Sequence, residues 1–322
     1  MKVCIVGAGA IGGFIGTRLA LAGQAQVSAL ARGATLAALR TRGWRLRMNG
    51  ELLGAPASAS DDAAALGAQD LVVIALKGQS LPALAPRLTP LLGPQTLVLP
   101  AMNGVPWWFL GDGAPLESVD PGGVVGAALP AARVLGCVVH ASTSTSEPGL
   151  VEHRMGQGLI VGEPAGGDSE RARHVAALLA QAGFEATVSA NIRQDIWYKL
   201  WGNLTVNPVS AITGATADRI LDDTLVRDFC SAAMMEVAAL GERLGCAIAQ
   251  SPQDRHQITR KLGAFRTSML QDVQAGRAIE LDAIVGAVVE IAQRLGVPTP
   301  NVNALFGLTR LFGRVHGLYP EA

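Results

Sequence analysis

The chain has 322 residues, of which 49% are hydrophobic and 16% charged, enough for two folded domains that each bury a core. The 26 basic residues balance the 26 acidic ones and only 4% of the chain is aromatic, so a nucleic-acid partner is not expected. The N-terminus does not resemble a signal peptide, and no apolar run reaches the roughly 18 residues of a membrane span. We expect a cytoplasmic protein without a membrane partner.

The four cysteines are scattered along the chain. Cys4, Cys137, Cys230 and Cys246 form no C-x-x-C pair and have no histidine at metal-ligand spacing. We therefore expect neither a disulfide framework nor a metal site, which suits a reducing compartment.

The first two thirds of the chain alternates short apolar runs with Ala/Leu-rich helical segments, the pattern of a parallel sheet covered on both faces. An Asn49-Gly50 turn inside the alternating stretch 44–53 predicts a hairpin. Helices are expected at 11–22 and 170–182. The predicted strands are 2–6, 26–30, 71–75, 96–99, 124–129, 135–142, 158–162 and 185–189.

Beyond residue 190 the strand signal ends and 3.6-residue periodicity takes over. The predicted helices there are 195–205, 223–244, 251–274 and 281–295. The expected fold is α/β: a Rossmann-type, doubly wound, mostly parallel sheet with an antiparallel extension over 1–190, and an all-α domain over 191–322. The first domain would bind the cofactor, and the second would bind substrate and carry catalysis.

The first predicted strand runs directly into a glycine-rich turn that opens a helix. Its residues are Gly7, Ala8, Gly9, Ala10, Ile11 and Gly12. In the Gly-x-Gly-x-x-Gly motif the glycines serve the tight turn, close approach to a pyrophosphate and helix packing, while helix N–H groups receive the phosphates. This context predicts a dinucleotide site; the alternative is a glycine-rich turn that binds nothing.

The end of the second strand indicates which dinucleotide binds. An NAD site carries an acidic residue about 20 positions after the motif, whereas this chain has Ala31-Arg32-Gly33. An arginine suits a 2′-phosphate, so NADP(H) is the expected cofactor. The alternative is a solvent-facing arginine in a loop.

Two further polar residues follow strands at the edge where open α/β sheets bind ligands. Lys77 follows strand 71–75 and is expected to reach the cofactor, although a helix-capping or surface lysine is the alternative. Asn103 follows strand 96–99 and is expected to face the nicotinamide ribose or the substrate, unless it serves only as a turn residue.

In the helical domain, Lys199, Asn203 and Asn207 recur every four residues and share one helix face. Their neighbours are aromatic or aliphatic, so a bound polar substrate would satisfy these groups; buried structural hydrogen bonds are the alternative. A lysine desolvated in such surroundings has its pKa lowered, which makes Lys199 the candidate acid. Ser268 and Glu280 flank a later turn, where an ordinary helix serine and a helix-start charge are the alternatives.

The whole constellation resembles the ketopantoate reductase family (2-dehydropantoate 2-reductases), and the resemblance covers nearly the whole chain. The most specific features are Lys199-Leu-x-x-Asn203-x-x-x-Asn207-Pro208 and Ser268-Met-Leu-Gln-Asp272. The others are the glycine motif, Ala-Leu-Lys77, Asn103-Gly104, Pro148-Gly149-Leu150-Val151-Glu152-His153 and Glu280-x-Asp282.

The resemblance implies NADPH-dependent reduction of a 2-oxo acid, such as ketopantoate to pantoate in pantothenate biosynthesis. Lys199 would donate the proton, and Asn203, Asn207 and Ser268 would hold the substrate. Glu280 would lie near the nicotinamide ribose and the substrate, and Asn103 would touch both ligands. Arg32 and Lys77 would serve the cofactor.

One departure concerns the substrate. Members of the family can carry another asparagine shortly after the Asn-Pro helix, where this chain has Ala211-Ile212-Thr213-Gly214. Trp107, Trp108, Trp197 and Trp201 are bulky and are expected near the cleft, so the pocket could admit a different 2-oxo acid. The alternatives are therefore a reductase of the same fold for another 2-oxo acid or an opine-like substrate, and a non-catalytic NADP(H) sensor. A homodimer is compatible with the apolar helical domain.

Overall fold

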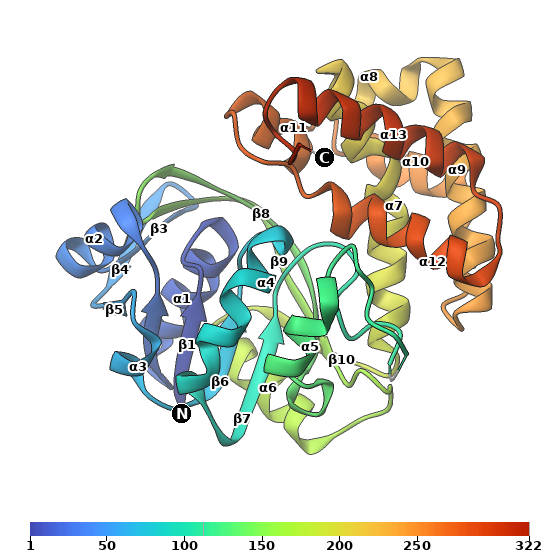
Figure 1. Cartoon of the computed structure of the whole chain (residues 1–322). Coiled ribbons are helices and arrows are strands. Elements are labelled where there is room, and N and C mark those ends of the chain that lie inside the picture. Colours follow the sequence, from blue (N-terminus) through green and yellow to red (C-terminus); the bar gives the residue numbers. More distant parts are fainter. Residues whose placement is uncertain (112, 322) are drawn as a thin grey trace. The chain divides into compact units, whose positions relative to one another are not determined.

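The computed structural model describes residues 1–111 and 113–321, which form two compact units (Figure 1). Unit 1 comprises Met1–Pro115 and Asp120–Asp195, and unit 2 comprises Leu116–Val119 and Ile196–Ala322. Among the described residues, no helix combines the length and hydropathy of a membrane span. The same residues contain no cluster of three His, Cys, Asp or Glu side chains that could hold a metal ion.

Unit 1 is built around a five-stranded parallel sheet with the order β5-β2-β1-β6-β7. Its strands are β1 (Lys2–Val6), β2 (Gln26–Leu30), β5 (Ser58–Ser60), β6 (Gln69–Ile74) and β7 (Leu92–Pro100). The continuous apolar runs of β1 and β6 are buried, as expected for central strands covered on both faces. This confirms the predicted α/β fold.

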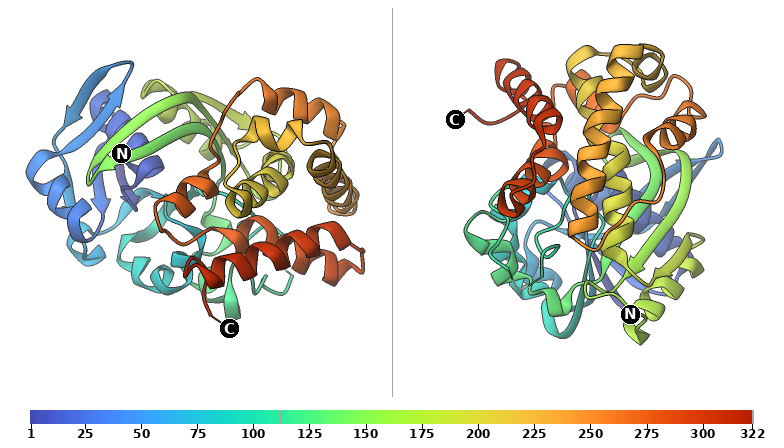
Figure 2. Two further views of the ribbon diagram at one scale, coloured as in Figure 1. Left: turned by 90° about the horizontal axis from the view of Figure 1, so that it is seen from above. Right: turned by 90° about the vertical axis from the view of Figure 1, so that its right-hand side faces the viewer.

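The antiparallel extension forms a second sheet, with the order β10-β9-β3-β4 and β8 paired with β9. Strands β3 (Trp44–Met48) and β4 (Glu51–Ala55) form the predicted hairpin, with positive φ at both Asn49 and Gly50. Strands β8 (Gly136–Glu147) and β9 (Leu150–Gly162) form a long antiparallel pair, drawn in green in Figure 2. Strand β10 (Glu185–Ser189) runs parallel to β9.

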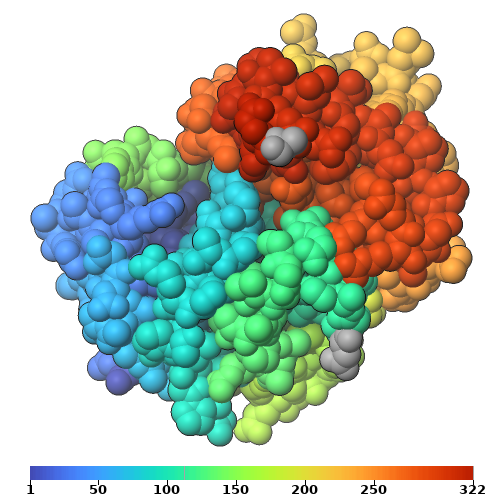
Figure 3. All heavy atoms as spheres, viewed as in Figure 1, coloured from blue at the N-terminus to red at the C-terminus, as the bar shows by residue number. Residues whose placement is uncertain are grey.

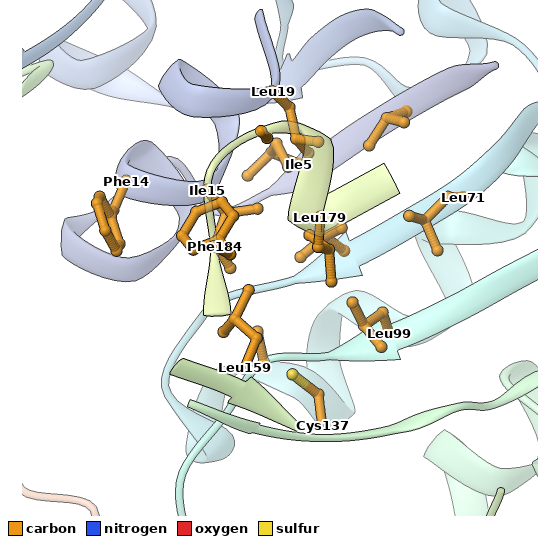
Figure 4. Close-up of a cluster of buried hydrophobic side chains, with 14 of the residues drawn as sticks. Ile5, Phe14, Ile15, Leu19, Leu71, Leu99, Cys137, Leu159, Leu179 and Phe184 are labelled. Carbon is orange, nitrogen blue, oxygen red and sulfur yellow. The ribbon is translucent and has the colours of Figure 1, made fainter. Parts of the chain in front are cut away.

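The helices of unit 1 cover these sheets. They are α1 (Ala10–Ala22), α2 (Gly33–Arg42), α3 (Ala63–Leu66), α4 (Leu81–Leu84), α5 (Val124–Ala128) and α6 (Glu170–Gln181). Phe14 and Ile15 from α1 meet Leu179 from α6 and Phe184 in one core cluster, shown in Figure 4. This core fixes the helix that starts at the glycine motif.

The prediction of a strand over 124–129 is wrong, because this segment forms helix α5. The buried carboxylate of Asp120 accepts hydrogen bonds from the amides of Val125 (2.7 Å) and Gly126 (2.9 Å). The N-cap residue of α5 is Gly123, so Asp120 binds first-turn amides from outside the helix and stabilises its N-terminus. The valine run suggested a strand, but the first turn of this segment is held as a helix.

Unit 2 is helical among its described residues. Its helices are α7 (Ile192–Thr213), which begins in unit 1, α8 (Ala217–Asp222), α9 (Thr224–Arg243), α10 (Pro252–Arg260), α11 (Ser268–Gln274), the π-helix η5 (Asp282–Gly286), α12 (Ala287–Leu295) and α13 (Pro300–Val315). The short segment Leu116–Val119 joins this unit because Glu290 on α12 accepts hydrogen bonds from the amides of Glu117 and Ser118, each at 2.9 Å.

The prediction of one helix over 251–274 is also wrong. The chain leaves α10 after Arg260, turns at Gly263, where φ is +63°, and starts α11 at Ser268. Thr267 caps α11, its hydroxyl oxygen accepting a hydrogen bond from the Leu270 amide at 3.1 Å. The break places Ser268 in the first turn of a new helix.

Candidate functional site

The sequence-predicted cofactor residues follow strand ends that lie level in the parallel sheet. The register pairs Val6 with Leu30 and with Ile74, and Ile74 with Pro100. The residues after this row therefore emerge at one edge, the carboxyl edge at which open α/β sheets bind ligands. These are the glycine motif, Arg32, Lys77 and Asn103.

The glycine motif has the geometry that a dinucleotide requires. Gly7 has φ of +90°, and a Cβ on Gly12 would lie only 2.0 Å from the Gly7 carbonyl oxygen. Gly9 is exposed, and a Cβ there would meet nothing within 4 Å. It is the N-cap of α1, and no side chain caps that helix. The turn is therefore closely packed at Gly7 and Gly12 and open at Gly9, which fits a pyrophosphate at the start of the helix.

Arg32 is exposed and occupies the N-cap position of α2. Within the part of the chain that the structure describes, its guanidinium forms no ion pair. Strand β5, which pairs with β2, is followed by two carboxylates. Asp61 lies 3.9 Å from Arg40, and Asp62 accepts a hydrogen bond from the Ala64 amide at 2.9 Å. Directly after β2, the edge presents the exposed cation of Arg32, which suits a phosphate.

Lys77 and Asn103 complete this edge. Lys77 is partly buried at the N-cap position of a 3₁₀ turn, but its side chain does not cap that turn. Asn103 is partly buried and comes three residues after β7, in a bend that precedes Gly104 at φ +85°. Among the described residues, no strand that follows this bend pairs antiparallel with β7, so Asn103 is not the turn residue of a hairpin.

In unit 2, helix α7 carries the predicted polar stripe. Lys199 and Asn203 are partly buried, and Asn207 is only 6% exposed. The rest of the helix packs through its tryptophans, because Trp197 and Trp201 donate their indole N–H groups to the Val237 and Met234 carbonyl oxygens of α9, at 3.2 and 2.8 Å. These contacts fix the rotation of α7 and thereby the direction of the stripe.

Ser268 is linked to the same helix face by buried hydroxyl groups. Ser210, one turn after Asn207, donates to the Asn207 carbonyl oxygen at 2.9 Å and contacts the hydroxyl of Thr267. Because Thr267 immediately precedes Ser268, this contact holds the start of α11 against α7. Sequence reasoning missed the link; the only signal was a threonine at a helix start, and its partner lies 57 residues away.

Glu280 directly precedes the helical run formed by η5 and α12, at a helix start as predicted. It is partly buried, and the π-helix η5 begins two residues later. The Ile279 amide donates to the Leu318 carbonyl oxygen at 3.0 Å, so a residue near the end of the chain holds the backbone before Glu280.

The structure changes the role expected for the tryptophans. All four are at most 8% exposed, and the indole N–H of Trp107 donates to the Leu129 carbonyl oxygen. Trp108 packs closely against Gly136. These side chains fill the cores of the two units, so they do not support a reshaped ligand pocket.

Comparison with known proteins shows the family to which the chain belongs. The family model "Ketopantoate reductase PanE/ApbA" matches residues 3–166, and its C-terminal counterpart matches residues 191–312. A 2-dehydropantoate 2-reductase from Mesorhizobium japonicum is 42% identical, with 99% of this chain and 100% of the relative covered.

Two solved structures support the same relationship. A candidate ketopantoate reductase from Ralstonia solanacearum is 52% identical with a TM-score of 0.96, covering 99% of both chains. The 2-dehydropantoate 2-reductase from Methylococcus capsulatus is 26% identical with a TM-score of 0.83, covering 98% of both.

Proposed function

Because this chain belongs to the ketopantoate reductase family, whose members reduce ketopantoate to pantoate with NADPH, we propose that it catalyses this reaction. The observation that carries the proposal is the polar stripe of α7. Asn207, its most buried amide, is 6% exposed. A 2-oxo acid offers oxygen acceptors and negative charge, which the amide and ammonium groups of this stripe are suited to bind.

In this proposal, residues 1–190 bind the cofactor and residues 191–322 bind the substrate. Gly7 through Gly12 would hold the pyrophosphate at the start of α1. Arg32 would pair with the 2′-phosphate, which an arginine fork matches well. Lys77 would bind the cofactor from the neighbouring strand end. NADP(H) is the proposed cofactor on these grounds.

When bound, NADPH would supply the hydride that reduces the C2 carbonyl. Lys199 would donate a proton to the carbonyl oxygen, as a general acid must when an alkoxide develops. Asn203, Asn207 and Ser268 would hold the 2-oxo acid by hydrogen bonds. Asn103 would contact both ligands, and Glu280 would contact the substrate and the nicotinamide ribose.

A second candidate substrate class rests on one segment. Where family members can carry a further asparagine, this chain has Ala211-Ile212-Thr213-Gly214, and the Thr213 hydroxyl donates back to the Val209 carbonyl oxygen at 2.7 Å. The contact that such an asparagine would make is therefore not replaced by Thr213. This favours a reductase of the same fold whose preferred substrate is another 2-oxo acid. A homodimer and a cytoplasmic location stay predictions.

The test is NADPH oxidation by the purified protein with ketopantoate and a panel of other 2-oxo acids and opine-type substrates. Ketopantoate turned over with the highest kcat/KM supports the proposed substrate. Faster turnover of another acid replaces the substrate but retains the reaction. NADPH binding without oxidation in the presence of any acid would show a cofactor sensor and overturn the enzymatic proposal.

A further inference from the structure

The residues on either side of Glu280 are hydrogen-bonded to the C-terminal end of the chain. Helix α13 is followed by a short segment that turns back on it, because the Leu318 amide donates to the Gly313 carbonyl oxygen at 2.7 Å. Figure 3 shows α13 and the segment that follows it, in dark red, at the surface of the molecule. This return brings Leu318 and Tyr319 beside residues 279–282.

Two hydrogen bonds hold Glu280 from either side. Before it, the Ile279 amide donates to the Leu318 carbonyl oxygen at 3.0 Å. After it, the Tyr319 hydroxyl donates to Asp282 Oδ1 at 2.5 Å. Adjacent residues of the C-terminal segment thus fix positions 279 and 282, and Glu280 lies between them.

Tight packing leaves this segment no alternative position. A Cβ on Gly313 would come within 2.7 Å of the Tyr319 Cβ and 3.3 Å of the Ile279 Cδ1. The Arg314 guanidinium lies over the Tyr319 ring, 5.9 Å from its centroid. The tyrosine is therefore packed against Gly313 at its Cβ and covered by Arg314 over its ring, and its hydroxyl is held at Asp282.

The acceptor is an unusual one. Burial raises the pKa of the Asp282 carboxyl, while the Tyr319 hydrogen bond and the charge of Arg310 act in the opposite direction. Asp282 is also the first residue of the π-helix η5, and such helices occur frequently at functional sites.

We propose that Tyr319 is a positioning residue for Glu280, acting through Asp282 and through the backbone contact of Leu318. The proposal rests on the function proposed above, because it requires Glu280 to contact substrate and cofactor. It assigns a role to Asp282, which the family resemblance includes only as part of the Glu280-x-Asp282 motif. It also makes the C-terminal segment part of the catalytic apparatus.

The test is a double-mutant cycle on kcat/KM for the best 2-oxo acid, with Tyr319→Phe, Glu280→Ala and the double variant. Tyr319→Phe removes one hydroxyl and keeps the ring between its neighbours. We expect it to lower kcat/KM about tenfold in the wild-type background and to have no further effect in the Glu280→Ala background, since coupled residues are not additive. Thr309→Val is the matched control, because it also removes a buried hydroxyl from α13 but leaves the C-terminal segment intact.

Hydrogen exchange of the unliganded protein provides a readout that does not depend on turnover. Tyr319→Phe should accelerate exchange of the Ile279 amide, and Thr309→Val should not. Equal losses of kcat/KM in both backgrounds, or unchanged exchange at Ile279, would overturn the positioning role. If Glu280→Ala keeps full activity, the role assigned to Glu280 fails and this inference fails with it. A wild-type protein that oxidises NADPH with no 2-oxo acid instead rejects the proposed function, and the exchange result still decides whether Tyr319 holds this backbone.

Discussion

In unit 1 the predicted cofactor residues follow level strand ends and a glycine turn, whereas in unit 2 the predicted substrate residues depend on one helix face and on helix ends. The position of the first group follows from strand register, since Val6, Leu30, Ile74 and Pro100 form one row. The position of the second depends on side-chain contacts between distant helices, such as Ser210 with Thr267. Substitutions in unit 1 should therefore affect cofactor binding, and substitutions in unit 2 should affect the chemistry.

The largest effect should come from Lys199→Ala. Loss of a general acid lowers turnover by roughly two to four orders of magnitude, while NADPH affinity, which depends on unit 1, should stay within about twofold. Steady-state kinetics and NADPH fluorescence titration measure the two quantities. Lys261→Ala is the matched control, because Lys261 is an exposed lysine of the same unit. Full activity of Lys199→Ala would remove the proposed proton donor.

Arg32→Ala should act on cofactor affinity alone. Losing a charge-assisted contact to a 2′-phosphate costs about 1.5–3 kcal/mol, or roughly 10- to 150-fold in the Kd of NADPH, and should leave the Kd of NADH unchanged. Arg40→Ala serves as the control, since Arg40 is an exposed arginine of the same helix, α2, and pairs with Asp61 after β5. Equal weakening of NADPH and NADH would contradict the NADP assignment.

Two glycines of the motif should separate ligand binding from folding. Gly9→Ala meets no atom within 4 Å, so the free energy of unfolding should change by less than about 0.5 kcal/mol while NADPH binds about tenfold more weakly. Gly12→Ala places a Cβ 2.0 Å from a backbone oxygen, and overpacking of this kind costs about 1–3 kcal/mol of stability. Chemical denaturation with and without NADPH measures both effects. Indistinguishable stabilities would show that Gly12 is not required for packing.

The smallest expected effect is a pH dependence of stability that arises from His256 in unit 2. Burial, with the nearby charges of Arg227 and Arg260, lowers the pKa of His256 below its usual 6.5, and its Nε2 lies 3.0 Å from the Ser231 hydroxyl. Below pH 6.5 the unfolded chain therefore binds more protons than the folded one, so stability should fall as the pH drops through this value. Thermal unfolding between pH 7.5 and about 5.5 checks this, and His256→Gln should flatten the dependence. If the stability of the His256→Gln variant falls with pH as steeply as that of the wild type, other titrating groups cause the loss of stability.

Much of the fold could be predicted because local signals determined it. The apolar runs of β1 and β6, the Asn49-Gly50 hairpin and the glycine motif each carry their structure within a few residues. The helix over 124–128 was not predicted, because its valines favour a strand and the contact of its first-turn amides with the Asp120 carboxylate is not visible in the sequence pattern. The break at 261–267 was missed because apolar periodicity continues on either side of Gly263.

The candidate site also has residues that local sequence pattern could place and residues that it could not. Lys199, Asn203 and Asn207 could be placed on one face from helical spacing alone, and Arg32, Lys77 and Asn103 from the ends of strands. The surroundings of Ser268 and Glu280 could not, since Thr267 finds its partner on α7 and Asp282 finds its partner at the C-terminal end. The buried state of the tryptophans was also not evident from their positions in the sequence.

We propose that unit 1 binds the dinucleotide by its strand-end edge and that the α7 stripe of unit 2 binds the 2-oxo acid. The decisive measurement is a crystal structure of the chain with NADP⁺ and pantoate. We expect the pyrophosphate at the amides of Gly9 to Gly12, the 2′-phosphate at Arg32, and pantoate within hydrogen-bonding distance of Lys199, Asn203 and Asn207. Pantoate bound without contact to α7, or the phosphates bound away from the glycine motif, would contradict it.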